Sequence, residues 1–343
     1  MKNHLFSDNS AGLNFVAIGG GNGLSTLLSG LKRFVKTGEK ELISIENLSA
    51  IVAVSDDGGS SGRLRDELQM LPPGDIRNCM VALSEDSLLL SKLFRHRFRG
   101  DGELGGHSFG NLFLAALSEI TGDFTEAVKL SSEILASKGH IYPATDADVR
   151  LAAELENGSI VRGETNISKI GNSIRRLYLE PENCQPLPEA LAAIYDADVI
   201  TIGPGSLFTS LLPPILVDGV SEAIAESGAI KIFICNLMTQ PGETDGFSAY
   251  KHINIVRDYA PEINFDYVLV NNRPISPSQV ERYRSEGAEQ IGVHGSVSPE
   301  TVEEAEIIYG NLLDEGEKVR HHPERLARVA LLCAVQAKNK VLV

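Results

Sequence analysis

Four short apolar runs in this sequence each end directly in small or polar residues. The segments that follow them are Gly19–Gly23, Asp56–Arg63, Gly203–Ser206 and Asn236–Thr244. A strand that is apolar along its whole length is buried on both faces, which is typical of a parallel sheet between two helix layers. In such sheets, ligands bind at the carboxyl ends of the strands, near the point where the strand order reverses. The pattern therefore predicts an α/β fold with a ligand site at those strand ends.

The first of these units shows the local pattern most clearly. It reads NFVAIGGGNGLSTLLSGL, an apolar run, then glycines, then Leu24, Leu27, Leu28 and Leu31 at helical spacing. This is the sequence of a strand, a glycine-rich turn and a helix. The later apolar runs lie within residues 50–54, 197–213, 229–246 and 265–272. We therefore predict a Rossmann-like, mostly parallel sheet with helices on both faces.

Two insertions interrupt the alternation of strands and helices. Helical patterns dominate around residues 75–140, where Asp75 follows a Pro-Pro-Gly break and is predicted to cap a helix that begins at Ile76. Residues 148–167 are interpreted as a β-hairpin with a type I′ turn at Asn157-Gly158. Two further helices are expected over 300–316 and 322–338. The simplest organisation is a flexible tail over residues 1–12 and a single elaborated domain over 13–343.

Charge and cysteine usage restrict the partners. Lys and Arg total 31 against 46 Asp and Glu, a formal net charge of -15 that repels duplex nucleic acid. The 4 cysteines form no C-x-x-C pair, so we expect reduced thiols and no zinc site. The N-terminus has no apolar signal region, and no stretch approaches the roughly 18 apolar residues of a membrane span. We expect a cytoplasmic protein with no membrane insertion.

Two glycine-rich turns could bind anionic groups. The turn Gly19–Gly23 lets the backbone approach a ligand and directs helix N-terminal N–H groups at a phosphate. It is not a G-x-G-x-x-G fingerprint, because Leu24 holds the last position, and it has no P-loop lysine. Residues 203–210, GPGSLFTS, repeat the arrangement with hydroxyl donors. Either turn alone could be a tight strand-helix connection, but two on one sheet favour a ligand with two anionic segments, such as a diphosphate.

An acidic pair follows the second strand. Asp56 lies 37 residues beyond Gly19, rather than the about 20 of the dinucleotide fingerprint, so simple NAD binding is not favoured. Asp56 or Asp57 could accept hydrogen bonds from a ribose, a sugar or a heterocycle, or hold a divalent cation. The alternative is a surface turn followed by a capped helix over 60–68.

The segment GGHSFGN contains a G-x-S-x-G pattern, Gly106 to Gly110. A nucleophile elbow requires a buried strand directly before it, and the preceding residues are polar and glycine-rich. We therefore interpret Ser108 as the N-cap of a helix, which leaves His107 and Asn111 on its first turn, where they could face a ligand.

A run of cations precedes this segment, consisting of Arg95, His96, Arg97 and Arg99. Cations complement the dipole at a helix C-terminus, so a solvated helix end is favoured over an anion site. Arg77 differs, because it lies in the first turn of the helix near Asp75 and could face the strand-end loops.

Several long motifs carry a resemblance to a known family. They are GGGNGLSTLLSGLK, SDDGGSSGRLRDEL, PPGDIRN, VALSE, GHSFGNL, ITGDF, ADVITIGPGSLFTSLLP and ICNLMTQPGETDG, in this order. The sequence resembles the bacterial gluconeogenesis-factor family, which is YvcK/CofD-like and related to 2-phospho-L-lactate transferase. The resemblance covers nearly everything after about residue 12.

The resemblance implies a Rossmann-like, CofD-type domain that binds a UDP-sugar such as UDP-N-acetylglucosamine or UDP-glucose. It also implies a role in growth on gluconeogenic carbon sources and in regulation of cell shape, in a cytoplasmic protein that forms a homodimer. The alternative function is transfer of a phospholactyl group to a deazaflavin-type acceptor, with Asp56 or Asp57 as the catalytic candidates and Mg²⁺ at Asp56 as the candidate cofactor. A third class, an interaction protein without a ligand, does not explain glycines at several strand ends.

Carried onto this chain, the resemblance implies a set of ligand-binding residues drawn from all the strand-end loops. They are Gly20, Gly21, Asn22, Gly23, Asp56, Asp57, Arg63, Arg77, Asn78, His107, Asn111, Gly203, Gly205, Ser206, Thr209, Asn236, Thr239 and Gln240.

Overall fold

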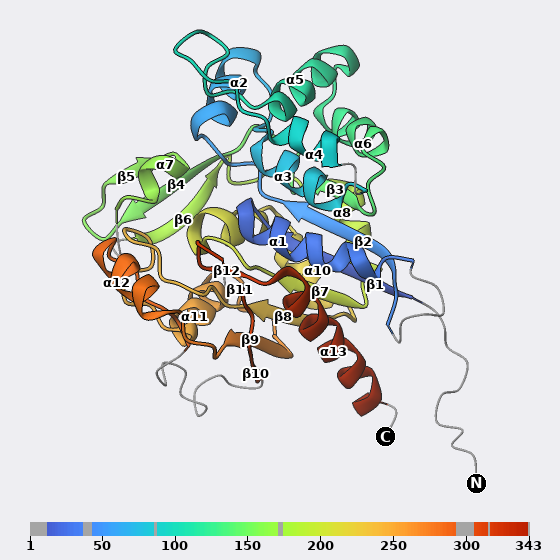
Figure 1. Cartoon of the computed structure of the whole chain (residues 1–343), viewed down its shortest axis with the longest axis vertical. Coiled ribbons are helices and arrows are strands. Elements are labelled where there is room, and N and C mark those ends of the chain that lie inside the picture. The colour runs from blue at the N-terminus through green and yellow to red at the C-terminus, as the bar shows by residue number, and fades with distance from the viewer. Residues whose placement is uncertain are drawn as a thin grey trace.

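The central sheet consists of parallel strands. In the described part of the chain these are β1 (Leu13–Gly19), β2 (Ile45–Val52), β3 (His140–Pro143), β7 (Val199–Ile202), β8 (Ile230–Ile234), β9 (Tyr267–Asn271) and β10 (Glu306–Gly310). Their order is β10-β9-β8-β7-β1-β2-β3, and each neighbouring pair is parallel (Figure 1). The chain leaves β1 toward β2 on one side and returns to β7 on the other, so the strand order reverses at β1. This confirms the predicted Rossmann-like sheet.

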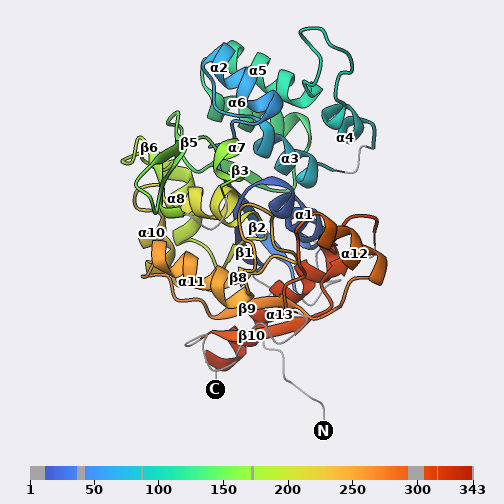
Figure 2. The same cartoon turned by 90° about the vertical axis from the view of Figure 1, so that its left-hand side faces the viewer.

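Helices cover both faces of the sheet. The structure, a computed structural model, describes residues 12–36, 43–85, 88–170, 174–292, 305–314 and 316–341. One layer contains α1 (Gly21–Leu31) and α13 (Pro323–Val341), and the opposite layer contains α8 (Pro188–Tyr195), α9 (Leu212–Ile215), α10 (Val220–Glu226) and α11 (Ala249–Tyr259) (Figure 2). The helix α12 (Pro277–Ser285) has no buried residue. The predicted tail lies outside the described residues, except for residue 12.

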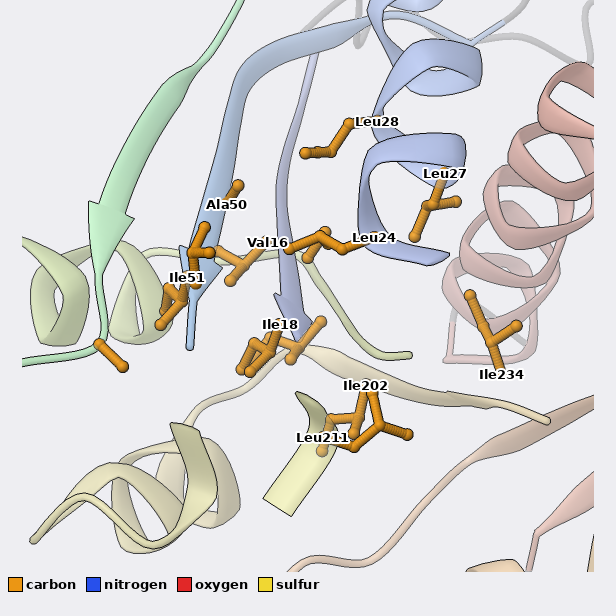
Figure 3. Packing of buried hydrophobic residues seen from close by; sticks show 14 of the residues in the cluster. Val16, Ile18, Leu24, Leu27, Leu28, Ala50, Ile51, Ile202, Leu211 and Ile234 are labelled. Carbon is orange, nitrogen blue, oxygen red and sulfur yellow. The ribbon is translucent and has the colours of Figure 1, made fainter. Parts of the chain in front are cut away.

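The core forms where α1 packs on the sheet. Leu24, Leu27 and Leu28 on α1 are fully buried, as are Ile18 on β1 and Ile51 on β2 (Figure 3). Their spacing on α1 presents one apolar face to the sheet, as the sequence pattern predicts.

The other side of α1 packs closely against α13. A Cβ on Gly30 would lie 2.1 Å from the carbonyl oxygen of Pro323, so only glycine permits this contact. The second predicted C-terminal helix, over 322–338, is confirmed as α13.

Five helices form a cap beyond the β2–β3 side of the sheet (Figure 1). They are α2 (Gly59–Leu68), α3 (Gly74–Leu83), α4 (Leu88–Arg95), α5 (Phe109–Thr121) and α6 (Phe124–Ile134), and we call them the helical cap. Ser108 is the N-cap of α5 and accepts a hydrogen bond from the backbone N–H of Asn111 at 3.2 Å, which confirms that prediction.

Two helices of the helical cap lack the side-chain N-caps that were predicted for them. The helix α3 begins at Gly74, its N-cap is Pro73, and Asp75 lies in its first turn with its carboxylate bound to another element. The helix predicted over 60–68 is confirmed as α2, Gly59–Leu68, but it has no side-chain cap. Neither helix has a side-chain hydrogen bond at its N-cap, and the Asp75 carboxylate accepts from the N–H of Gly21 instead.

Replacement of Asp123 is expected to destabilise the cap slightly. Asp123 is exposed and its Oδ1 accepts a hydrogen bond from the backbone N–H of Glu126 at 2.7 Å, which makes it the N-cap of α6. Asp123→Ala should lower the free energy of unfolding by about 1 kcal/mol, measured by urea denaturation. Asp123→Ser keeps a capping oxygen and should stay close to wild type. Equal destabilisation by both variants would contradict the capping role.

The predicted hairpin forms, but its turn differs from the prediction. β4 (Arg150–Leu155) pairs with β5 (Ile160–Arg162), and β6 (Ile174–Glu180) adds a third antiparallel strand in a sheet separate from the main one. The turn is not type I′, because Gly158 has a φ of 79° while Asn157 does not have a positive φ. The backbone N–H of Gly158 donates to the carbonyl of Leu155 at 2.9 Å, as in a three-residue loop that ends in a glycine.

The predicted hairpin also extends too far. After β5 the chain turns at Gly163 and forms the single helical turn α7 (Glu164–Ile167).

The helix predicted over 300–316 is wrong where the structure describes it. Residues 306–310 form β10, and β11 (Leu313–Asp314) pairs with β12 (Arg320–His321). Ile307, Ile308 and Tyr309 are β-branched or aromatic and fit a strand, and the open side of β9 supplies the partner that the local sequence cannot reveal.

All four cysteines, Cys79, Cys184, Cys235 and Cys333, are buried free thiols, as predicted.

Among the residues that the structure describes, no single helix is both long and apolar enough to cross a membrane. The bent pair Leu207–Ile215 and Val220–Glu226 meets that test by length and composition alone.

Candidate functional site

The turns after β1 and β7 meet backbone to backbone at the point where the strand order reverses. A Cβ on Gly23 would lie 2.1 Å from the carbonyl oxygen of Pro204. Asn236, after β8, holds the β7 turn from its other side. Its Oδ1 accepts from the N–H of Gly205 at 3.2 Å, and its Nδ2 donates to the Gly205 carbonyl at 2.7 Å. Three strand ends are thereby fixed together, as the Gly-turn pattern predicts.

A cavity of about 250 Å³ opens at this junction. Its walls come from the start of α1, the β7 and β8 turns, and β12. The lining residues are Asn22, Gly23, Thr26, Pro204, Gly205, Ser206, Asn236, Leu237, Met238, Gln240, Val319, Arg320 and His321. Six predicted ligand residues therefore lie together here: Asn22, Gly23, Gly205, Ser206, Asn236 and Gln240.

Two residues of the cavity wall carry buried polar atoms without a partner. Gln240 donates from Nε2 to Ser206 Oγ at 2.8 Å, while its Oε1 is buried and has no hydrogen bond. His321 is 7% exposed and its Nε2 also has no hydrogen bond. Burial lowers the pKa of His321 to about 4, so the imidazole is neutral near pH 7. Buried polar atoms are normally paired, so these two atoms mark a place where a ligand can complete the hydrogen bonding.

Protein carboxylates already occupy some of the N–H donors that the glycine turns offer. Asp75 Oδ2 accepts from the N–H of Gly21 at 2.7 Å, and buried Glu243 accepts from the N–H of Phe208 at 2.9 Å. Burial raises the pKa of Glu243 to about 7. The first four N–H groups of a helix have no intrahelical partner, and the next amides of α1 belong to Asn22 and Gly23, which both line the cavity. The sequence pattern had missed both carboxylates.

Acidic side chains gather behind the start of α1. Burial and the nearby charge of Asp56 raise the pKa of Asp75 to about 6, and the same two causes raise the pKa of Glu164 well above its usual range. Asp56 Oδ1 accepts from the N–H of Gly58 at 2.8 Å. Within the described residues, no three His, Cys, Asp or Glu side chains are placed to hold a metal ion. Asp56 and Asp75 could supply two carboxylates to Mg²⁺ only with further oxygens from water or a ligand phosphate.

Asp57 has a structural partner. Its Oδ1 accepts from the N–H and the hydroxyl of Thr165, at 3.0 and 2.7 Å. A Cβ on Gly163 would lie 2.2 Å from Asp57 Oδ2. Asp57 therefore anchors α7 to the loop after β2, and it does not line the cavity.

The predicted residues of the helical cap form a second group. Ser60 Oγ lies 2.9 Å from His107 Nδ1 and accepts from Asn111 Nδ2 at 3.1 Å, and all three residues are buried. Arg77 donates to the side chain of Asn78 at 2.7 Å. These residues, with Arg63, do not line the cavity at the strand-order reversal.

Five other predicted residues have structural roles in the fold. Thr239 Oγ1 accepts from the N–H of Glu289 at 2.8 Å. Thr209 is buried in the π-helical turn Leu207–Leu211, and Gly203 has a φ of 92° that favours glycine. Gly20 and Gly21 shape the β1 turn, where a Cβ on Gly20 would lie 2.6 Å from Asp75 Oδ2.

Comparison with known proteins identifies the family of this chain. Residues 15–313 match the family described as 2-phospho-L-lactate transferase CofD. The chain belongs to the CofD family. Within that family, it is 49% identical over 278 residues to a gluconeogenesis factor of Halalkalibacterium halodurans, covering 81% of this chain and 83% of the relative. It is 46% identical to the gluconeogenesis factor of Bacillus subtilis, covering 80% of this chain and 83% of that protein.

A solved structure supports the assignment of the fold. A crystal structure of a protein from Bacillus halodurans superposes with a TM-score of 0.86 at 44% identity, covering 94% of this chain and 100% of that chain. The resemblance to gluconeogenesis factors is therefore confirmed at the level of family and name.

Among the cavity residues of this CofD family member that the sequence pattern missed, two carry charged or titratable side chains. Arg320 and His321 lie on β12, a strand of two residues that no glycine turn or apolar run announces. The only local signal is the cationic run VRHH, which charge patterning alone assigns to solvent. Their place at the cavity depends on the pairing of β12 with β11.

Proposed function

We propose that this protein is a gluconeogenesis factor that binds a nucleotide sugar of the UDP-N-acetylglucosamine or UDP-glucose type. In this role it supports growth on gluconeogenic carbon sources and regulates cell shape. The observation that carries the binding proposal is the cavity where two glycine turns meet, with unpaired polar atoms on Gln240 and His321. The gluconeogenesis-factor name of the relatives supports the physiological part.

The chemistry of the cavity suits the parts of such a ligand. The N–H groups at the start of α1 and the exposed guanidinium of Arg320 favour phosphate oxygens. Gln240 Oε1 can accept from an imide N–H such as that of uracil. The cavity volume, about 250 Å³, is below the roughly 300–1,000 Å³ of drug-sized pockets, so it fits one part of a nucleotide sugar and leaves the rest at the rim.

Asn236→Ala is expected to weaken UDP-N-acetylglucosamine binding at least about tenfold, measured by isothermal titration calorimetry. The variant removes both hydrogen bonds that hold Gly205 against the cavity. The control is Asn272→Ala, an exposed asparagine at the end of the neighbouring strand β9, which should bind as wild type. UDP-glucose and ADP-glucose in the same titration separate recognition of the sugar from recognition of the base.

Absence of saturable binding by the wild-type protein to any of these nucleotide sugars would end the proposal. Equal weakening by the two asparagine variants would instead show that the effect is not specific to the β7 turn. The proposed cytoplasmic homodimer is tested separately, by cell fractionation and by light scattering of the purified protein.

The Asp56 and Asp75 pair favours a second candidate function. Two carboxylates beside the start of α1, one of them with a raised pKa, are suited to a divalent cation that would offset their repulsion. When bound, Mg²⁺ would neutralise charge on a transferred phosphoryl group. The family description supports phospholactyl transfer to a deazaflavin-type acceptor. Incubation with Mg²⁺, acceptor and an activated phospholactate, followed by mass spectrometry, tests it, and absence of product at long incubation excludes it.

A further inference from the structure

Four arginines from neighbouring elements gather around the start of α5. They are Arg63 on α2, Arg77 on α3, Arg95 at the end of α4 and Arg97 in the loop that follows, and we call them the cap arginines. Arg63 Nη2 donates to the carbonyl of Gly105 at 2.6 Å, and Arg97 Nη1 donates to the next carbonyl, Gly106. These two guanidinium groups are thus anchored on adjacent peptide units.

Packing brings the other two arginines to the same place. A Cβ on Gly110 would lie 2.8 Å from both Cγ and Cδ of Arg77, so the stem of Arg77 lies against the first turn of α5. Phe94 packs on Phe109 with ring centroids 5.8 Å apart, which fixes the end of α4, and therefore Arg95, beside the start of α5.

The cap arginines lack the carboxylate partners that other arginines have. In the residues described by the structure, none of the four forms an ion pair, whereas Arg150 and Arg162 on the surface do. Burial lowers the pKa of Arg77, and the charges of Arg97 and Arg95 lower it further, while Asp75 and Asp56 act in the opposite direction. Burial lowers the pKa of His107 as well, followed by the charge of Arg63. The cluster therefore holds an excess of positive charge.

Two buried polar atoms near this cluster have no partner. One is Nε of Arg77, and the other is Oδ1 of Asn111, a residue that is 2% exposed. The amide of Asn111 can be turned so that Nδ2 is the free donor and Oδ1 accepts from Ser60, because the two orientations are isosteric. The Asn111 amide, on the first turn of α5, and the Arg77 guanidinium, whose stem packs on that turn, would then each hold a free donor, and proteins use both kinds of donor for phosphate.

We propose that the cap arginines bind a small dianion, a phosphate monoester or inorganic phosphate, at a site separate from the nucleotide-sugar cavity. None of the four lines that cavity. Asp75, bound to Gly21 at the start of α1, places a carboxylate between the two regions and disfavours a single continuous anion across them. The protein would then bind a nucleotide sugar and a phosphorylated small molecule at the same time.

Titration of the full chain with inorganic phosphate, followed by calorimetry and ³¹P NMR, tests the proposal. Arg95→Gln with Arg97→Gln should weaken phosphate binding at least about tenfold, because two charge-assisted donors are lost. Arg95→Lys with Arg97→Lys should restore part of the affinity. Lys129→Gln with Lys251→Gln removes the same charge from exposed positions on α6 and α11 and should bind phosphate as wild type.

The affinity for UDP-N-acetylglucosamine, measured on the same samples, distinguishes one site from two. This affinity should stay within about twofold of wild type in the double glutamine variant, and saturating phosphate should not displace the bound UDP-N-acetylglucosamine. No phosphate binding by the wild type, wild-type affinity in the double glutamine variant, or equal loss of both ligands would overturn the proposal. Phosphate binding that depends on Arg95 and Arg97, without any nucleotide-sugar binding, would leave it standing and remove the proposed function alone.

Discussion

Gly23→Ala is expected to abolish nucleotide-sugar binding and to lower the free energy of unfolding by roughly 2 kcal/mol. The new Cβ would lie 2.1 Å from the carbonyl oxygen of Pro204, a backbone atom that cannot swing aside. Overpacking of this kind lowers the free energy of unfolding by up to about 3 kcal/mol, and the better helix propensity of alanine offsets about 1 kcal/mol of this loss. The β1 and β7 turns must then separate, which opens the cavity. Urea denaturation and calorimetry with UDP-N-acetylglucosamine measure the two effects.

Two other glycines provide matched controls for this experiment. Gly139→Ala, just before β3, makes a clash of the same kind with the carbonyl oxygen of Leu48, 2.7 Å from the new Cβ, and neither residue lines the cavity, so this variant should be destabilised and still bind. Gly228→Ala meets no atom within 4 Å and should change neither property. Wild-type binding by Gly23→Ala would show that contact between the two turns is unnecessary for the ligand.

Asp75→Asn is expected to tighten binding of an anionic nucleotide sugar about tenfold in the absence of divalent cations. An asparagine oxygen can still accept from the N–H of Gly21, which lies 2.7 Å from the wild-type carboxylate. The substitution removes one negative charge from the helix end at which the ligand phosphates are proposed to bind, and unit charges a few ångströms apart near a protein surface interact by a few kcal/mol at most. Calorimetry at pH 7.5 with EDTA measures the change.

The same substitution should alter the pH dependence of stability. The pKa of Asp75 is raised from 3.8 to about 6 in the folded protein, mainly by burial and then by Asp56. Between these values the native state binds more protons than the unfolded state, so the wild type loses stability as pH rises through this window. Up to about 3 kcal/mol is lost between pH 3.8 and 6, and the loss is constant above it. Asp75→Asn should lack this loss.

Urea denaturation of both proteins from pH 4 to 8 checks this expectation. Other groups, such as Glu243, titrate in both proteins, so the difference between variant and wild type isolates Asp75. A difference that does not grow between pH 4 and 6 would contradict the raised pKa. If Asp75→Asn instead weakens the ligand and removes a dependence on Mg²⁺, the carboxylate serves a cation, and the transferase function gains support.

Local patterns predicted most of the elements that build the site. The leucines of α1 lie at helical spacing and are buried, and Ser108 caps α5 through a hydrogen bond that needs only three neighbouring residues. Such features depend on contacts within one turn or one strand, so the sequence contains all the required information. The helix predicted over 300–316 failed for the opposite reason, because β10 becomes a strand only by pairing with β9.

The site itself was predicted in part. Asn22, Gly205 and Asn236 were expected at strand ends and do line one cavity, because parallel strands bring their carboxyl ends to the same side of the sheet. Asp75 was expected to cap its own helix and instead binds Gly21, which is 54 residues away along the chain. No rule based on neighbouring residues could predict that Asp75 accepts a hydrogen bond from Gly21 and not from the backbone amides at the start of α3.

The sequence by itself determined the α/β class, the strands that run into glycine turns, and membership of a known family, because each is a property of local pattern or of shared motifs. Only the tertiary structure decided which polar residues share a site. It divided the predicted set into a cavity at the start of α1 and a cluster in the helical cap. It also added Arg320 and His321 through a two-residue strand and joined Asp57 to α7. Those assignments depend on strand pairing and on close backbone packing at Gly23, which are long-range contacts that periodicity and spacing do not encode.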